Sequence, residues 1–415
     1  MNNSETKVID WKKNLTVIWL SQFLAMIGFG CCMPFIPLLL KENLHIDDEH
    51  LRGFYVSIYT LAGMSSLCIA TAVWGMLADK FGRKIMLLRA SYAAAIFYPL
   101  LALMPNFWSL VAVRFVCSFF SGTVNPAQIL IVSTSPKEKH GFVLGTMSTA
   151  VWSGEMVGYL AGALMVEYFG YTVAFGSCGI IYLISALLVQ FFAVENFQRV
   201  PKSAKIQQPK HRFRDLATPG VVCVLSMFLI MGISRRIESP YIAMLIEKVH
   251  GDDGAKILTG IISAAAALGG VISGMLIGHL SDKFKPVVLL IPIIIASVAA
   301  TAVQAASTGI VMLIGARFTA YLFAGGLQPV LQIMLSKITL TKLRGTYFGW
   351  SASLSTAGGI FCSFISGPIA LYVGVRGIFY AAAIIMALML PVLIPTVRFC
   401  NKEEKAILAA EKGKG

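Results

Sequence analysis

Long apolar runs separated by short polar segments dominate this chain of 415 residues. A membrane-spanning helix needs about 20 largely apolar residues, and twelve such runs follow one another along the sequence. Glycine and proline recur inside them, which membrane helices tolerate because neighbouring helices satisfy the freed backbone groups. The pattern predicts an all-α polytopic membrane protein. The expected spans are residues 14–40, 52–77, 85–104, 107–132, 141–165, 172–193, 218–246, 256–279, 287–306, 309–335, 345–371 and 377–398.

Composition strengthens this prediction. Hydrophobic residues make up 57% of the chain and charged residues 13%, about half of the roughly 25% charged residues of a soluble domain. The formal net charge is +14, which in a soluble protein would suggest nucleic acid. Few long polar stretches could carry a nucleic-acid face, so no nucleic-acid partner is expected. The same numbers argue against a soluble enzyme, a disordered protein and a disulfide scaffold.

The charges are distributed unequally between the two sides of the membrane. Twelve spans place both termini on one side, and most lysine and arginine residues fall in the termini and loops of that side. The positive-inside rule makes this side cytoplasmic, so we expect a multi-pass protein of the bacterial inner (cytoplasmic) membrane with both termini in the cytoplasm. The basic residues on the other side are Lys41, Arg52, Lys248, Lys256 and Arg376.

The two halves of the chain repeat each other. Arg114 and Pro126 recur as Arg317 and Pro329, and the turn 75–81 recurs as 278–284. Six spans repeated in the same orientation imply two bundles related by an axis along the membrane normal, with a shared site between them. The expected parts are a bundle over 1–194, a basic cytoplasmic linker over 195–217, a second bundle over 218–399 and a cytoplasmic tail over 400–415.

A loop signature between the second and third spans resembles that of the major facilitator superfamily. Its residues are Gly75, Asp79, Lys80, Gly82, Arg83 and Lys84. The resemblance implies a fold of twelve helices in two pseudo-symmetric six-helix bundles, and a loop that stabilises the outward-facing state by docking against the eleventh span. Gly75 would allow close helix packing and Gly82 a tight turn. The alternative is that the basic residues only anchor the loop in the cytoplasm.

Two further motifs resemble those of 12-span drug/proton antiporters, and the whole chain looks closest to MdtG-type multidrug exporters. Arg114 with Gly122 is similar to the exporter motif of the fourth span. The fifth span carries a glycine motif in which Tyr159 replaces a proline and Ala163 a glycine. The glycines of this motif are Gly145, Gly154, Gly158 and Gly162. We expect them to pack against the eighth span and to seal the periplasmic side, and the alternative is a packing role alone.

Two acidic residues, Glu155 and Glu238, are the only carboxylates well inside the spans. Burial disfavours a charged carboxylate and a nearby arginine favours it, so such a group can load and release protons as access alternates. We prefer Glu238 as the proton carrier, since it lies beside the Arg235-Arg236 pair. Glu155 could instead pair with Arg114, whose charge in the exporter motif is thought to repel the coupling proton. Ion pairing without a transport role is the alternative for either acid.

Polar and adaptable apolar side chains in the spans predict a substrate cavity. Met and aromatic side chains suit promiscuous pockets, although most such residues only pack or face lipid. The candidates are Gln22, Met26, Asn125, Gln128, Arg235, Arg236, Tyr241, Arg317, Gln328 and Gln332.

Absent motifs narrow the function further. The sequence has no G-x-x-x-x-G-K-[ST] phosphate loop, so ATP-driven transport is not expected, and it carries no hydrolase or metalloprotease signature. No cofactor or metal is expected, and the proton gradient is the expected energy source. The resemblance implies a monomeric exporter of small, mostly apolar drug-like compounds by proton antiport, with the substrate, protons and the lipid bilayer as partners. The alternatives are an exporter of an anionic metabolite or siderophore, an importer or uniporter, and a non-transporting receptor or scaffold.

Overall fold

The computed structural model describes residues 10–136, 139–195, 218–284, 286–339 and 344–412, and all regular elements in these ranges are helical. The first half contains α1 Trp11–Cys32, η1 Met33–Phe35, α2 Ile36–Glu42, α3 Glu49–Phe81, α4 Arg83–Ala102, α5 Phe107–Phe120, α6 Val124–Thr134 and α7 His140–Phe192. The second half contains α10 Pro219–Ile237, η3 Ser239–Tyr241, α11 Ile242–His250, α12 Ala255–Lys283, α13 Pro286–Ala306, α14 Ile310–Ala324, α15 Leu327–Lys337, α16 Arg344–Tyr372, α17 Val375–Ala387 and α18 Met389–Lys412.

The described helices match the apolar runs. Eleven helical stretches are long and apolar enough to cross a membrane, and one of them is the 53-residue α7. Gly170 interrupts α7 with a φ of 79°, which divides it into two arms that are each long enough to span a bilayer. Counting the arms separately accounts for all twelve expected spans.

Interruptions of the helices recur at equivalent places in the repeat. Gly170 and Gly374 both have positive φ, at 79° and 85°, a region that glycine enters at little cost. The turn η1 contains Pro34 and the turn η3 contains Pro240. Because proline has no backbone N–H, it breaks the helical hydrogen-bond ladder, and so the first and seventh spans are both bent.

Contacts between residues divide the chain into two compact units. Unit 1 comprises Met1–Ile46, Ile58–Pro209 and Gly254–Ala264, and unit 2 comprises Asp47–Ser57, Lys210–Asp253 and Ala265–Gly415. The start of α3 thus groups with the second half, and the start of α12 with the first. This grouping differs from the expected bundle boundaries, which stay a prediction. Residues 196–217 of the expected linker lie outside the described residues.

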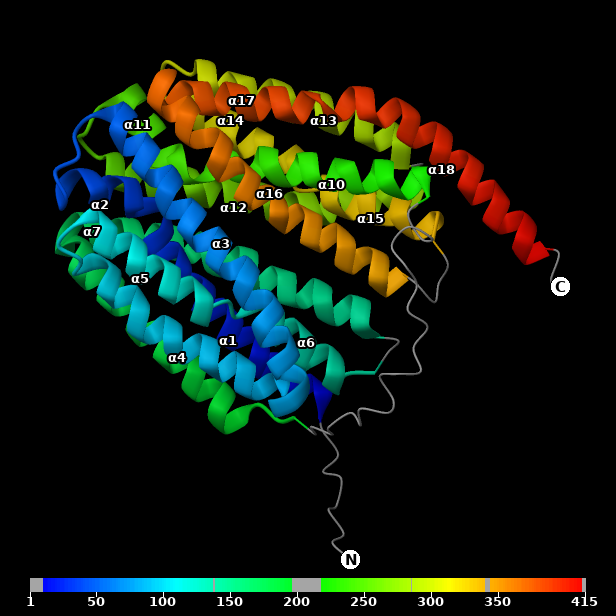
Figure 1. Cartoon of the computed structure of the whole chain (residues 1–415), viewed down its shortest axis with the longest axis horizontal. Helices are drawn as coiled ribbons and strands as arrows, with labels where there is room; N and C mark the ends of the chain where they lie inside the picture. Colours follow the sequence, from blue (N-terminus) through cyan, green and yellow to red (C-terminus); the bar gives the residue numbers. More distant parts are fainter. Residues whose placement is uncertain (1–9, 137–138, 196–217, 285, 340–343, 413–415) are drawn as a thin grey trace, which may run out of the picture. The chain divides into compact units, whose positions relative to one another are not determined.

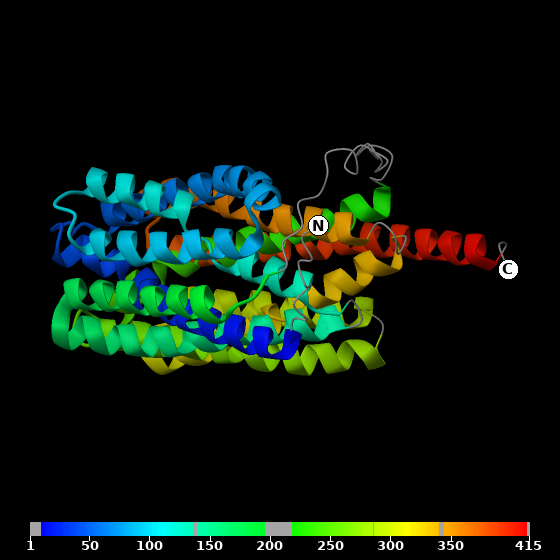
Figure 2. The same cartoon turned by 90° about the horizontal axis from the view of Figure 1, so that it is seen from below.

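Each unit has its own cluster of buried apolar side chains, and Figures 1 and 2 show the helices that carry them. In unit 1, α7 packs along α1 and α4. In unit 2, α10 packs against α16, and α13 packs against α14 and α17. Large apolar side chains also remain exposed, among them Trp108, Phe191 and Ile384. Exposed apolar side chains of this size are suited to a lipid environment rather than to water.

Candidate functional site

A buried ion pair joins two helices of unit 2. Arg317 of α14 donates from Nη1 to Oε1 of Glu238 at 2.7 Å, and the two side chains are 3% and 5% exposed. Glu238 follows the last residue of α10, just before the bend at η3. The bend therefore brings a carboxylate from the seventh span against an arginine of the tenth.

Two polar residues complete this cluster. Gln304 of α13 is fully buried, and its Oε1 accepts a second bond from Arg317 Nη1 at 3.1 Å. Tyr321 accepts from Arg317 Nη2 at 3.2 Å and also faces the Arg235 guanidinium. Glu238 Oε2 and Gln304 Nε2 are buried without a hydrogen-bond partner. One acceptor and one donor beside the Arg317 guanidinium thus have no partner among the described residues, which makes this cluster a candidate site for a proton or a polar ligand.

The equivalent arginine of unit 1 has aromatic surroundings. Arg114 of α5 lies over the ring of Tyr59 from α3, with 5.1 Å between the guanidinium carbon and the ring centroid. Gly63 makes room for it, since a Cβ there would lie 2.7 Å from Arg114 Nε. Glu155 accepts from the Tyr159 hydroxyl at 3.4 Å. Arg114 and Arg317, equivalent in the repeat, therefore both face tyrosine.

The remaining cavity candidates lie in varied environments. Gln22 is fully buried with both amide atoms unsatisfied. Tyr241 is also buried and donates to Ser366 of α16 at 2.9 Å. Asn125 and Gln328 are exposed, and Met26 is buried against Gly154. The half-buried candidates are Gln128, Arg235, Arg236 and Gln332.

The glycine motif of the fifth span packs against α1, not against the eighth span. A Cβ on Gly154, Gly158 or Gly162 would come within 2.5 Å of α1 backbone atoms. The expected packing partner was therefore wrong, because helical spacing identifies the small-residue face of a helix but not the helix that meets it. A Cβ on Gly145 would have no neighbour within 4 Å, so this glycine is outside the packed stripe.

The start of α12 does contact the fifth span, through Gly260. The contact is made at Tyr159 and Ala163, the two positions at which the glycine motif differs from the antiporter motif it resembles. A Cβ on Gly260 would lie 2.4 Å from Ala163 Cβ and 2.6 Å from the Tyr159 carbonyl oxygen. Ala163 occupies a position where the antiporter motif has glycine. The missing Cβ of Gly260 provides the space that Ala163 takes up.

The loop signature is tied to the end of the sixth span. Glu195 accepts hydrogen bonds from the backbone N–H groups of Arg83 at 2.9 Å and Lys84 at 2.8 Å, and so caps α4. Lys84 Nζ in turn donates to the carbonyls of Gln190 and Ala193, at the end of α7. Lysine is favourable at a helix C-terminus, where unpaired carbonyls collect.

The two glycines of the loop behave differently. Gly82 has a φ of 97°, which confirms the expected tight turn. A Cβ on Gly75 would meet nothing within 4 Å among the described residues, so the close packing expected at Gly75 stays a prediction. Lys80 is exposed, and the Asp79 side chain lies outside the described residues. Docking against the eleventh span stays a prediction.

Replacing Gly82 by alanine should lower the stability of the protein. The φ of 97° is strained for any residue with a Cβ, at a cost of about 1–3 kcal/mol. We expect a lower apparent Tm for Gly82→Ala in detergent. Gly75→Ala is the matched control, because its new Cβ has open space. Equal Tm values for the two variants would contradict the strained turn.

Sequence reasoning missed three residues of these sites. Gln304 is a single polar residue near the end of an otherwise apolar run, and Glu195 is the first residue of the expected linker. Tyr321 follows Arg317 by one helical turn, and this spacing, at which two side chains share a face, is the signal that could have identified it. Among the described residues, no group of three or more His, Cys, Asp or Glu side chains is arranged to hold a metal ion.

Comparisons with known proteins agree with this architecture. The sequence profile of the Major Facilitator Superfamily matches residues 18–303 and 229–413. A multidrug resistance efflux pump PmrA homologue of Lactococcus lactis subsp. lactis (strain IL1403) is 29% identical over 381 residues, covering 90% of this chain and 92% of the relative. The multidrug resistance protein MdtG of Salmonella arizonae is 29% identical over 379 residues, covering 90% and 93%.

A solved structure has the same fold. A mutant of the nucleoside transporter NupG superposes with a TM-score of 0.73 at 12% identity, covering 92% of this chain and 99% of that protein. At this identity the likeness concerns the fold alone. It confirms the all-helical major facilitator architecture that the apolar runs and motifs predict.

Proposed function

The chain belongs to the Major Facilitator Superfamily, and from this premise we propose that it exports small, mostly apolar drug-like compounds in exchange for protons. As a member it is a secondary transporter of small molecules in the membrane, not an enzyme. The relatives named as multidrug efflux pumps support the cargo class. The observation that carries proton coupling is the buried Glu238–Arg317 pair.

The pair has the properties of a proton-operated switch. Burial disfavours an ionised carboxylate, whereas the adjacent guanidinium favours it, so the charge state of Glu238 depends on whether Arg317 stays in contact. A proton on Glu238 removes the attraction that holds Arg317. Gln304 Oε1 then remains as a neutral acceptor for the guanidinium. We assign Gln304 the role of holding Arg317 in place while Glu238 is protonated.

The direction of proton movement follows from the orientation of the chain in the membrane. We place both termini in the cytoplasm, supported by the excess of lysine and arginine in the loops on their side of the membrane. The ends with residues 43–48 and 251–254 then face outward in a bacterial cytoplasmic membrane. Protons entering from the more acidic outside would drive export by alternating access between the two bundles.

A second cargo class has specific support. Arg114, Arg235, Arg236 and Arg317 lie within the spans with only two carboxylates, Glu155 and Glu238, so the spans carry a formal charge of +2. A buried charge is expensive in hydrocarbon and is expected to face water, substrate or a counter-charge. An anionic metabolite or siderophore would suit such a cavity.

Transport in proteoliposomes under an imposed pH gradient tests these proposals together. The probes are a fluorescent lipophilic dye cation and a fluorescent carboxylate dye of similar size. Gradient-dependent movement of the cation supports drug/proton antiport, and movement of the carboxylate alone supports the anionic cargo. A gradient that accelerates neither probe nor any member of a drug-like library would overturn the proposed function in favour of a receptor or scaffold.

A further inference from the structure

Arg89, a half-buried arginine of α4 in unit 1, is partnered by an aromatic ring. Its guanidinium carbon lies 3.9 Å from the centre of the Trp74 ring, which α3 supplies. Arg89 Nε and Nη1 are buried without a hydrogen-bond partner, and within the described ranges no carboxylate forms an ion pair with this side chain. A guanidinium that no counter-charge neutralises is expensive to keep near hydrocarbon.

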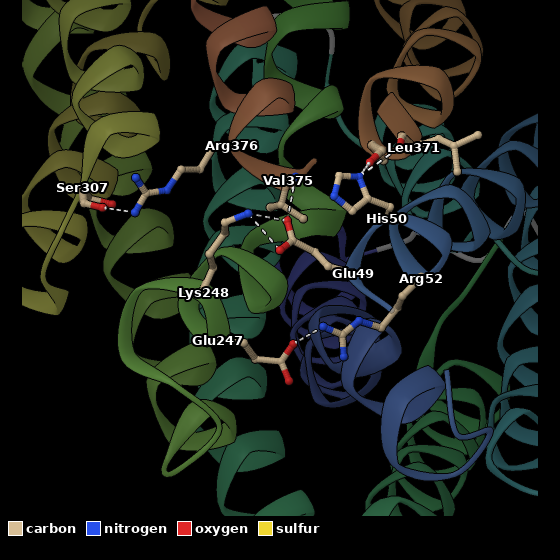
Figure 3. Close-up of polar contacts among 10 residues, drawn as sticks. Glu49, His50, Arg52, Glu247, Lys248, Ser307, Leu371, Val375 and Arg376 are labelled. Atoms are coloured by element: carbon tan, nitrogen blue, oxygen red, sulfur yellow. Dashed lines mark hydrogen bonds and ion pairs between the residues drawn. The ribbon is translucent and has the colours of Figure 1, made fainter. Parts of the chain in front are cut away.

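Other arginines near helix ends are satisfied within the chain. In unit 2, Arg52 Nη2 donates to Glu247 Oε2 at 2.6 Å (Figure 3). Arg376 Nη2 donates to the Ser307 carbonyl oxygen at 2.9 Å in the same view (Figure 3). Arg89 differs from both, because no carboxylate or carbonyl of the described residues accepts a hydrogen bond from it. Its counter-ion would therefore have to come from outside the described part of the chain.

The ring beneath Arg89 is held firmly in place. Trp74 Nε1 donates to the Phe119 carbonyl oxygen at 2.7 Å, which lacks a helical partner because α5 ends at Phe120. The Trp74 ring also packs against the rings of Phe119 and Phe120, with 5.7 Å between centroids in each pair. A cation over an aromatic face is attracted to it. The guanidinium is therefore fixed in position, whereas a basic residue that only anchors a helix extends its charge into water.

Arg89 lies on the exposed face of α4. Ile85 and Ile96 share this face by their helical spacing and are 53% and 61% exposed. Apolar side chains with this exposure are suited to contact with lipid chains. A charged group that is held between them, rather than in the interior of unit 1, is accessible to a lipid.

The depth of the pair matches the boundary between headgroups and hydrocarbon. The helix α3 has 33 residues, a length of about 50 Å, so its ends extend beyond a hydrocarbon core of about 30 Å. Trp74 and Arg89 each lie about 10 Å inside the helix ends at Phe81 and Arg83. Tryptophan is enriched at this level of membrane proteins. The phosphates of a phospholipid leaflet are within reach of a long side chain there.

We propose that Arg89 and Trp74 form a binding site for the phosphate group of an anionic phospholipid, whose acyl chains lie along Ile85 and Ile96. Guanidinium groups bind phosphate through charge-assisted hydrogen bonds. A headgroup without an ammonium, as in phosphatidylglycerol, fits better than phosphatidylethanolamine, because no carboxylate of the described residues pairs with Arg89 and could receive the ammonium. This inference does not depend on the cargo of the transporter or on the direction of transport.

Native mass spectrometry of the full-length, delipidated protein in detergent tests the site. The probes are phosphatidylglycerol and phosphatidylethanolamine with identical acyl chains, and the wild type should bind the first of these at least about tenfold more tightly. Arg89→Gln should weaken phosphatidylglycerol binding by about tenfold and leave phosphatidylethanolamine binding unchanged, since one charged contact is lost. Lys13→Gln, at an exposed position near the start of α1, is the matched control and should bind like the wild type.

The alternative results each overturn the proposal. Equal phosphatidylglycerol affinity of the wild type and Arg89→Gln rejects the site, and an equal loss in Lys13→Gln would indicate a general effect of charge. Equal binding of the two lipids by the wild type rejects the headgroup preference. Displacement of the lipid by an equimolar amount of inorganic phosphate would assign the site to soluble anions instead.

A second variant keeps the proposal testable if Arg89→Gln folds poorly. Arg89→Lys retains the charge but loses the planar group that stacks on Trp74. It should weaken phosphatidylglycerol binding by a few-fold, and an affinity equal to that of the wild type would reject the stacked guanidinium as the phosphate ligand.

Discussion

Glu238→Gln is expected to abolish pH-gradient-driven accumulation of substrate while gradient-free exchange of labelled for unlabelled substrate continues. A proton gradient of one pH unit can support up to about tenfold accumulation in one-for-one exchange, since 1.4 kcal/mol corresponds to a factor of ten. Glutamine keeps the shape and the acceptor oxygen that Arg317 contacts at 2.7 Å, but it cannot carry a proton. The variant should therefore lose the coupling of transport to protons and still bind the substrate.

The controls separate proton carriage from damage to the fold. Glu238→Gln leaves Arg317 buried without its counter-charge, which can cost several kcal/mol, about 3–5 in other buried pairs. Apparent Tm must therefore be measured beside transport. Glu167→Gln, at an exposed position near the end of the first arm of α7, controls for charge removal. Loss of coupling in Glu155→Gln alone would transfer the role to Glu155, and full coupling in both variants would refute a carboxylate relay.

The helices and the repeat were predictable from sequence because both depend on local pattern. A run of about 20 apolar residues in a bilayer forms a helix, because a helix satisfies all its backbone hydrogen bonds within the segment. Gly170 and Gly374 could be matched along the sequence, and both adopt positive φ. Gly82, identified from a motif, likewise adopts the conformation that only glycine enters easily.

Pairings between distant helices were not predictable in the same way. Glu238 and Arg317 were both identified as buried charges, yet nothing local indicated that they contact each other, and Glu238 has no acidic counterpart in the first repeat. A helical pattern specifies which face is polar, whereas the partner depends on bends such as that at η3.

The close contact between α1 and α7 makes Gly158 the most sensitive position of the glycine motif. A Cβ there would lie 2.4 Å from the Ile27 carbonyl oxygen and 3.0 Å from Gly30 Cα. Both atoms belong to the α1 backbone, so no flexible side chain can move aside. Gly158→Ala should cost about 1–3 kcal/mol of stability through overpacking, measured as a lower apparent Tm in detergent.

Gly145→Ala is the matched control for this substitution. It lies in the same arm of α7, where a Cβ meets nothing within 4 Å. Alanine favours a helix over glycine by about 1 kcal/mol, so Gly145→Ala should be as stable as the wild type or more so. The same propensity gain applies to Gly158→Ala, and only the clash with α1 opposes it. A Tm for Gly158→Ala that matches Gly145→Ala would mean that α1 and α7 can separate freely, and that the glycine stripe does not stabilise unit 1.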